Sequence, residues 1–149
     1  MTEQQRRNAE ALRAMFAAFE RREFAAADRF LTSDCVIDGS TSPELDLRDQ
    51  TLSARADALD RRFPEWRVRL LDVVPAVDGA SLVAVMSSFM RRAGVSGGVA
   101  TLSGGLYRFR DAHVCAVQAF PEIDAALRAA GLDPAAVTLD LDRASRSGA

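Results

Sequence analysis

The strongest constraint on the fold is the long run of alternating residues from 99 to 120. Residues 99–110 alternate between two faces, as expected of a β-strand. Asp111-Ala112-His113 then turns the chain, and residues 114–120 run back as a second strand. A hairpin of this length twists and curves. With helices expected before and after it, the hairpin predicts a cone of sheet and helices around a pocket that holds a ligand.

Composition limits the classes of function. One domain is expected for 149 residues, and we place it at residues 1–132. Residues 133–149 form a tail that is either docked or disordered. Hydrophobic residues make up 48% of the chain and the net charge is −2, which indicates a soluble protein and argues against a nucleic-acid partner. All 19 basic residues are Arg, which excludes a Schiff-base lysine or a phosphate-loop lysine and fits a GC-rich bacterial coding sequence.

The residues that bind metals are scarce. Cys35 and Cys115 do not form a CxxC pair, and His113 is the single histidine, so we expect no metal and no cofactor. No segment approaches the ~20 apolar residues that a membrane helix needs, and no signal sequence is visible. We therefore expect a cytoplasmic protein with no membrane partner and two reduced, buried thiols.

Periodicity gives the order of the elements. Apolar residues recur at helical spacing in two N-terminal helices and again in a third helix, which Asp49 can cap and Pro64 stops. Period-two strands follow on each side of an Asp78-Gly79 turn. The order is helix, helix, strand, helix, four strands, helix, which predicts an α+β fold. The expected bounds are 3–22, about 24–31, 35–38, 49–63, 66–74, 82–90, 99–110, 114–120 and a last helix from 121 to Gly131.

This order resembles the nuclear transport factor 2-like superfamily, in particular its bacterial SnoaL-like and ketosteroid-isomerase-like members. The resemblance rests on Phe63-Pro64-Glu65-Trp66-Arg67-Val68, Tyr107-Arg108-Phe109-Arg110-Asp111, Val117-Gln118-Ala119-Phe120 and residues 125–132. It covers residues 5–132 and implies a cystatin-like cone, in which a curved antiparallel sheet wraps the N-terminal helices. It also implies a homodimer packed through the open face of the sheet.

The resemblance implies a catalytic residue at one position. Asp38 stands before Gly39-Ser40-Thr41-Ser42-Pro43, where the isomerases carry a carboxylate base. The other reading of Asp38 is a loop residue that caps this turn. The isomerases also use a tyrosine on the first helix and an aspartate where this chain has Gly105. Both donors are missing here, which argues against steroid isomerisation. His113 in the turn and Arg110 beside Asp111 do not reproduce the pairs of the polyketide cyclases or the epoxide hydrolases.

A second set of residues is expected to line the pocket and bind a small hydrophobic molecule. Tyr107 is either a pocket donor or an aromatic residue of the core or interface. Gly104-Gly105 indicates a bend in its strand. The expected binding residues are Phe16, Phe19, Phe63, Trp66, Met86, Ser103, Tyr107 and Val117.

These residues leave three functions open. The first is an enzyme that isomerises, cyclises or dehydrates an apolar or polycyclic metabolite, including polyketide-type molecules, with Asp38 as the proton-transfer base. The second is a non-catalytic ligand-binding or accessory dimer. The third is a dimerisation module whose own aromatic and methionine side chains fill its pocket.

Overall fold

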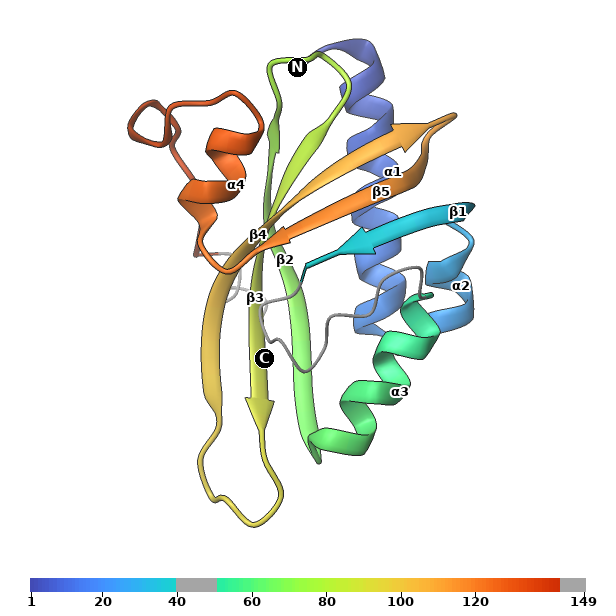
Figure 1. The fold of residues 1–149 in the computed structure, drawn as a ribbon, viewed down its shortest axis with the longest axis vertical. Coiled ribbons are helices and arrows are strands. Elements are labelled where there is room, and N and C mark those ends of the chain that lie inside the picture. The colour runs from blue at the N-terminus through green and yellow to red at the C-terminus, as the bar shows by residue number, and fades with distance from the viewer. Residues whose placement is uncertain (40–50, 143–149) are drawn as a thin grey trace.

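A five-stranded sheet forms the body of the protein in this computed structural model, which describes residues 1–39 and 51–142. The strand order is β1-β5-β4-β3-β2, so β1 and β2 are the two edges (Figure 1). β5 pairs in parallel with β1 and antiparallel with β4, and the remaining neighbours are antiparallel. The strands are β1 (Leu31–Asp38), β2 (Glu65–Pro75), β3 (Leu82–Arg91), β4 (Val99–Arg110) and β5 (His113–Phe120).

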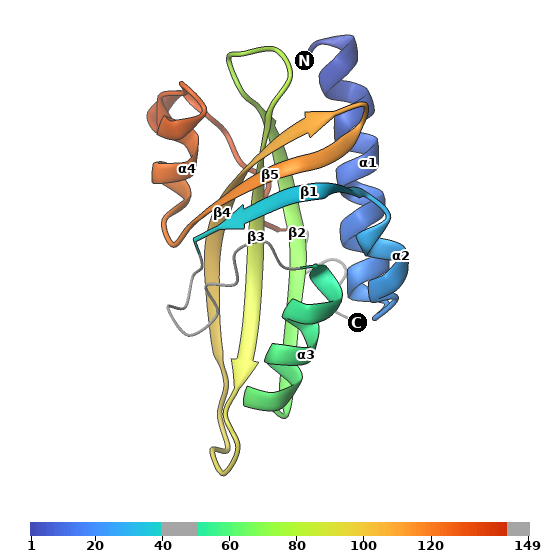
Figure 2. The same ribbon diagram turned by 45° about the vertical axis from the view of Figure 1, so that its right-hand side comes forward.

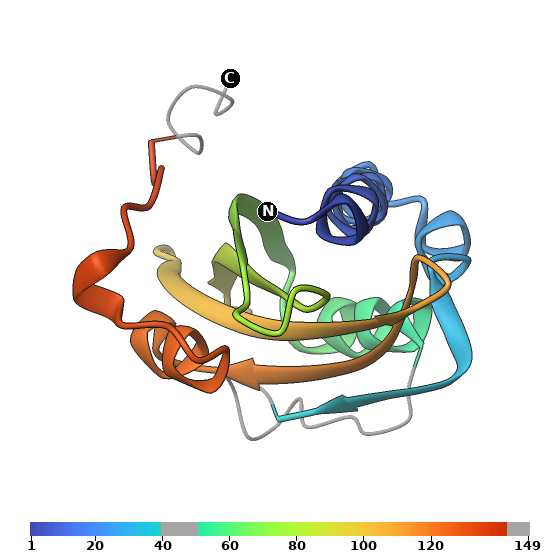
Figure 3. The ribbon, with the colours of Figure 1, turned by 90° about the horizontal axis from the view of Figure 1, so that it is seen from above.

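Helices cover both faces of this sheet. The three that precede β2 lie together on one side, and α4 lies on the other side (Figures 1 and 2). They are α1 (Glu3–Glu20), α2 (Phe24–Asp28), α3 (Leu52–Arg62) and α4 (Ile123–Ala129). Viewed from above, the strands curve across the structure with α1 on their concave side (Figure 3). The α+β cystatin-like fold expected from the sequence is confirmed. The sheet is open rather than closed, and its first strand adds a parallel pair.

Local chemistry explains the ends of the helices. Thr2 accepts from the backbone of Gln5 and Gln5 reaches back to Thr2, which forms a capping box at the start of α1. Thr51 caps α3 by accepting from Ala54 N at 3.1 Å. The expected cap Asp49 lies outside the described residues. Gly131 has a φ of 80° after α4, as predicted for a glycine that ends a helix. None of the described helices combines the length and the hydropathy needed to cross a membrane.

The sheet separates two apolar clusters. The inner cluster lies between α1, α2 and the concave face, and it includes Leu12, Phe16, Ile37 and Tyr107. The outer cluster lies under α4 and includes Val83 and Leu106.

Gly104 and Gly105 serve opposite faces of β4. A Cβ at Gly104 would come within 2.7 Å of Ala126 Cβ on α4, and one at Gly105 within 2.9 Å of the Tyr107 ring. The glycine pair therefore allows close packing on both faces of β4. From the sequence alone, the same pair is explained by a bend in the strand.

Residues 133–142 follow the outer cluster. Pro134–Ala136 forms a short 3-10 helix, and Val137 and Leu139 pack against the cluster under α4. Asp140 N donates to Asp72 Oδ2 at 2.9 Å. This part of the predicted tail is docked, and residues 143–149 lie outside the described residues. The boundary placed at residue 132 stays a prediction.

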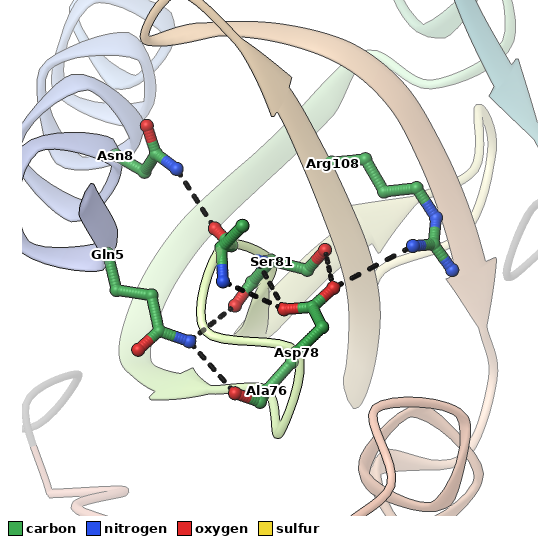
Figure 4. A network of polar contacts seen from close by, with 7 residues as sticks. Gln5, Asn8, Ala76, Asp78, Ser81 and Arg108 are labelled. Carbon is green, nitrogen blue, oxygen red and sulfur yellow. Dashed lines mark hydrogen bonds and ion pairs between the residues drawn. The ribbon is translucent and has the colours of Figure 1, made fainter. Parts of the chain in front are cut away.

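A buried polar network fastens α1 to the β2–β3 turn (Figure 4). Gln5 Nε2 donates to the carbonyl oxygens of Ala76 at 2.8 Å and Ser81 at 3.2 Å. Asp78 accepts from the backbone of Ala80 and Ser81 and from the Ser81 hydroxyl, which fixes the turn that the sequence predicts. Burial raises the pKa of Asp78, and these hydrogen bonds outweigh it, so the net pKa is lowered. The network holds α1 over the sheet, and α1 forms one wall of a cavity on the concave face.

Candidate functional site

A cavity of about 140 Å³ lies between the concave face of the sheet and helices α1 and α3. Its wall is mostly aliphatic, aromatic and thioether, with four polar residues. An engineered apolar cavity of ~150 Å³ holds benzene, so this volume suits a molecule of about one ring. The lining residues are Met15, Phe16, Phe19, Leu31, Ile37, Leu52, Arg55, Leu59, Val68, Met86, Ser88, Met90, Ser103, Tyr107, Val117 and Ala119.

Tyr107 is one of the four polar residues of this wall. It sits on the inner face of β4, 7% exposed, with its ring edge-on to Phe16 at 6.1 Å between centroids. Burial raises its pKa, while the positive charge of Arg55 acts in the opposite direction. The hydroxyl is therefore neutral and can donate. It donates to Met86 Sδ at 3.9 Å, and because a thioether is a weak acceptor, an oxygen atom of a ligand would be a better partner.

Arg55 is the charged residue among the described lining residues, and α3 carries it. The start of α3 is held by Asp28, whose carboxylate accepts from Leu52 N at 2.6 Å and from Ser53 N at 3.3 Å. Leu52, Arg55 and Leu59 follow helical spacing and all line the cavity. One terminal nitrogen of Arg55, Nη1, is buried away from water. The cavity therefore combines a neutral donor from β4 with a cation from α3.

Six of the eight residues expected to bind a ligand lie in this wall. The six are Phe16, Phe19, Met86, Ser103, Tyr107 and Val117. The other two, Phe63 and Trp66, pack in a separate cluster with Ala56 and Leu59 instead. Their position follows from the order of the chain. Both residues lie where α3 leads into β2, beyond Leu59, the last residue of α3 that lines the cavity. As a binding set, these residues stay a prediction.

Asp38 occupies a different position from the one that the proposed base requires. It is exposed, and it is absent from the described lining of the cavity. Strand alternation gives the reason: Ile37 points into the cavity, so Asp38 faces the opposite side of β1. Asp38 also makes a polar contact of its own. The loop residues Ser40 and Thr41, which a capping Asp38 would bond, lie outside the described residues.

Arg55 is the charged lining residue that the sequence interpretation missed. Its spacing from Leu52 and Leu59 places all three on one face of α3, so the signal is present in the sequence. An arginine at such a position is ordinarily solvated, and this masks the signal. Ser88 was missed for a similar reason, although it shares a strand face with Met86 and Met90. Among the described residues, no three His, Cys, Asp or Glu side chains gather as a metal site would require.

A second hollow of about 520 Å³ lies between the end of α1 and β2. It shares Phe19 and Val68 with the cavity, and four arginines and Glu20 line it together with Trp66. Arg21 pairs with Glu23 at 3.0 Å, and Arg22 pairs with Asp60 at 2.9 Å. Because this pairing offsets much of the positive charge, the apolar cavity is the better candidate site.

The sequence profile of the SnoaL-like domain matches residues 12–118. This chain belongs to the SnoaL-like domain family. The match runs from within α1 to within β5, and it confirms the resemblance to the nuclear transport factor 2-like superfamily. No curated protein gives a significant match.

Solved structures share the fold of this SnoaL-like domain at low sequence identity. TerC co-crystallised with polyporic acid is 14% identical over 80% of this chain and 94% of that chain, with a TM-score of 0.63. A candidate polyketide cyclase from Xanthomonas campestris is 20% identical over 83% and 96%, with a TM-score of 0.59. A Catenulispora acidiphila protein with a ketosteroid isomerase-like fold, in complex with trimethylamine, is 17% identical over 93% and 99%, with a TM-score of 0.62.

These neighbours establish the fold and leave the ligand open. One is crystallised with an acid and another with an amine. The same fold therefore accommodates ligands of opposite chemistry. Any ligand of this SnoaL-like domain has to be inferred from its own cavity.

Proposed function

We propose that this SnoaL-like domain binds a small, mostly apolar molecule of about one ring that carries an acceptor oxygen. The observation that carries the proposal is the neutral Tyr107 hydroxyl, which lies in an apolar cavity with a thioether as its acceptor. A carbonyl oxygen of the ligand would replace this weak contact with an ordinary hydrogen bond. The ring would occupy the space between Phe16, Met86 and Leu59.

Larger ligands require movement of the wall. The polycyclic metabolites expected from the sequence exceed about 140 Å³. Three methionines line the cavity, and their unbranched side chains adapt readily to different shapes. They are Met15, Met86 and Met90. A second ring would enter only where these side chains rotate.

Benzamide tests the proposal, because it is a single ring with one carbonyl and no charge. We expect it to bind the wild-type protein and to shift the amide resonances of β4 and α3 in a titration followed by NMR. Tyr107→Phe removes the hydroxyl and keeps the ring, so affinity should fall by about fivefold to tenfold, as for one lost hydrogen bond. Cys115→Ala lies outside the cavity wall and serves as the control. If neither benzamide nor its charged counterpart benzoate binds the wild type, the proposal is refuted.

A second candidate is an enzyme that moves a proton on such a molecule. Membership of the family and the fold shared with a candidate polyketide cyclase support it. Tyr107 would donate a hydrogen bond to the enolate oxygen that forms when a ketone loses its α-proton. Asp38 stays the proposed base, at the end of the strand whose Ile37 lines the cavity. To reach that proton, its carboxylate would have to turn inward from the exposed face.

Deuterium exchange separates binding from catalysis. Cyclohexanone in D₂O exchanges its α-protons only where a base removes them, and NMR follows the loss of their signal. An enzyme would accelerate this exchange, and Asp38→Asn would abolish the acceleration while benzamide binding persists. No acceleration by the wild type would favour a ligand-binding or accessory domain.

The homodimer also stays a proposal. Val36 and Leu102 are 40% and 45% exposed, and strand alternation places both on the outer face of the sheet. A second copy packed on this face would cover them. Leu102→Arg should then convert a dimer to a monomer in light scattering after size exclusion.

A further inference from the structure

The cavity wall contains a fixed positive charge, and this charge bears on which ligand is selected. A guanidinium stays protonated at all physiological pH values. Arg55 presents it from α3, and its Nη1 is buried away from water. Arg55 also makes a polar contact of its own. A guanidinium has five N–H donors, which is enough to hold a ligand oxygen in addition to that contact.

The position of Arg55 is set by its helix. The first turn of α3 is anchored to Asp28, and its last turn is tied to α1 through the Asp60–Arg22 ion pair at 2.9 Å. Asp60 also accepts from Trp66 Nε1 at 2.8 Å, which joins the same end of α3 to β2. With both ends fastened, the helix presents Arg55 at one place in the wall. Fixing the helix reduces the backbone entropy that is lost when a ligand binds.

Arg55 on α3 and Tyr107 on β4 both line the cavity. The charge of Arg55 is close enough to affect the titration of Tyr107. A carboxylate offers two oxygens with about four acceptor sites, so one group could accept from both residues. A guanidinium and a carboxylate form paired, charge-assisted hydrogen bonds that are stronger than those to a neutral carbonyl, so a carboxylate gains more than an amide from the same donors.

We propose that the cavity selects ring acids: a single-ring molecule whose carboxylate, or equivalent anionic oxygen, is held jointly by the Arg55 guanidinium and the Tyr107 hydroxyl. This inference rests on the proposed function. It narrows the proposed ligand from an apolar molecule with an acceptor oxygen to one whose oxygen is anionic. The apolar wall holds the ring, and the two donors hold the charge. Arg55 is the specificity-determining residue in this arrangement.

Benzoate and benzamide form a matched pair that tests the inference, because they share shape and differ in charge. We expect benzoate to bind the wild-type protein about tenfold or more tightly, as for a charge-assisted hydrogen bond. Arg55→Gln should remove this preference, because benzoate loses far more affinity than benzamide when the guanidinium is absent. Arg55→Lys, which keeps the charge but loses the forked geometry, should retain part of the preference. Isothermal titration calorimetry measures both ligands on each variant.

A control variant separates local from general charge effects. Arg61→Gln removes an exposed arginine from the same helix and should leave the preference for benzoate unchanged. The NMR spectrum of each variant without ligand shows whether the variant folds. If Arg55→Gln does not fold, the inference is tested with Arg55→Lys and with the NMR shifts that benzoate causes in the wild type. Equal affinity of the wild type for benzoate and benzamide would overturn this inference and leave the proposed function in place. Failure of both to bind would overturn the proposed function itself.

Discussion

The guanidinium of Arg22 donates to both carboxylate oxygens of Asp60, at 2.9 Å each. Arg22 follows α1 with a φ of 62°, in the left-handed region where glycine is usual. Its backbone N–H donates to Phe19 O and that of Glu23 to Ala18 O, which completes a Schellman turn. The same guanidinium lies 5.2 Å from the ring centroids of Phe24 and Trp66. An arginine therefore occupies a position unfavourable for its backbone while its side chain joins α1 to α3.

Two substitutions of Arg22 separate the backbone effect from the side-chain effect. Arg22→Ala loses the contacts with Asp60 and keeps the strained backbone, whereas Arg22→Gly loses the contacts and relieves the strain. We expect the glycine variant to be the more stable of the two by about 1 kcal/mol, since left-handed backbone costs ~1–2 kcal/mol in residues with a Cβ. Urea unfolding measures the difference. Equal stabilities would show that this turn carries no strain.

The adjacent glycines of β4 give a second prediction, because they face opposite sides of the sheet. Gly104→Ala would press its Cβ against Ala126 and displace α4, at a cost of about 1–3 kcal/mol in stability. Benzamide binding should be retained in this variant. Gly105→Ala would press against the Tyr107 ring instead and should weaken benzamide binding by severalfold. Thermal unfolding and calorimetry on the pair check both effects, and identical behaviour of the two variants would contradict the two-face arrangement.

Short-range patterns predicted most of this fold because they report burial along one element. The alternation in residues 99–120 specified β4, β5 and the turn between them, where Asp111 and Ala112 adopt φ values of 52° and 59°. Strand β1 was predicted to begin at Cys35 and begins at Leu31. Its parallel pairing with β5 depends on segments about 80 residues apart. No local pattern encodes such a contact.

The candidate site was less accessible from the sequence for a similar reason. The residue type predicts that an aromatic side chain is buried, but it does not predict in which of two neighbouring clusters that side chain packs. Phe16 and Tyr107 line the cavity, while Phe63 and Trp66 pack beside it. Arg55 is recognised only once α3 is placed against the sheet.

The buried thiol of Cys35 predicts a loss of stability in alkali. Burial raises the pKa of Cys35 from 9.0 to about 11. Between these values the unfolded chain releases the thiol proton and the folded chain keeps it, so the free energy of unfolding falls as pH rises. The expected slope is about 1.4 kcal/mol per pH unit. Tyr107, whose pKa burial also raises, adds to the fall above pH 10, its ordinary pKa.

Urea unfolding at pH 8, 9 and 10 measures this slope in variants of the two cysteines. Cys35→Ala should flatten the decline between pH 9 and 10. Cys115→Ala is the matched control, because it removes a partly buried thiol and leaves Cys35 in place. An unchanged decline in Cys35→Ala would assign the titration to another group.

The side chain of Gln5 should matter more to stability than its position near the N-terminus suggests. It is 2% exposed and donates to the buried carbonyls of Ala76 and Ser81. Gln5→Leu removes this donor from both carbonyls, which keep backbone partners in Gly79 N and Ala76 N, so we expect a cost of about 0.5–1.5 kcal/mol for each lost hydrogen bond. Gln5→Glu should cost more, because a carboxylate would face two carbonyl oxygens. Gln4→Leu is the control, since Gln4 is exposed on the same turn. Equal urea midpoints for the Gln4 and Gln5 variants would show that the β2–β3 turn does not depend on α1.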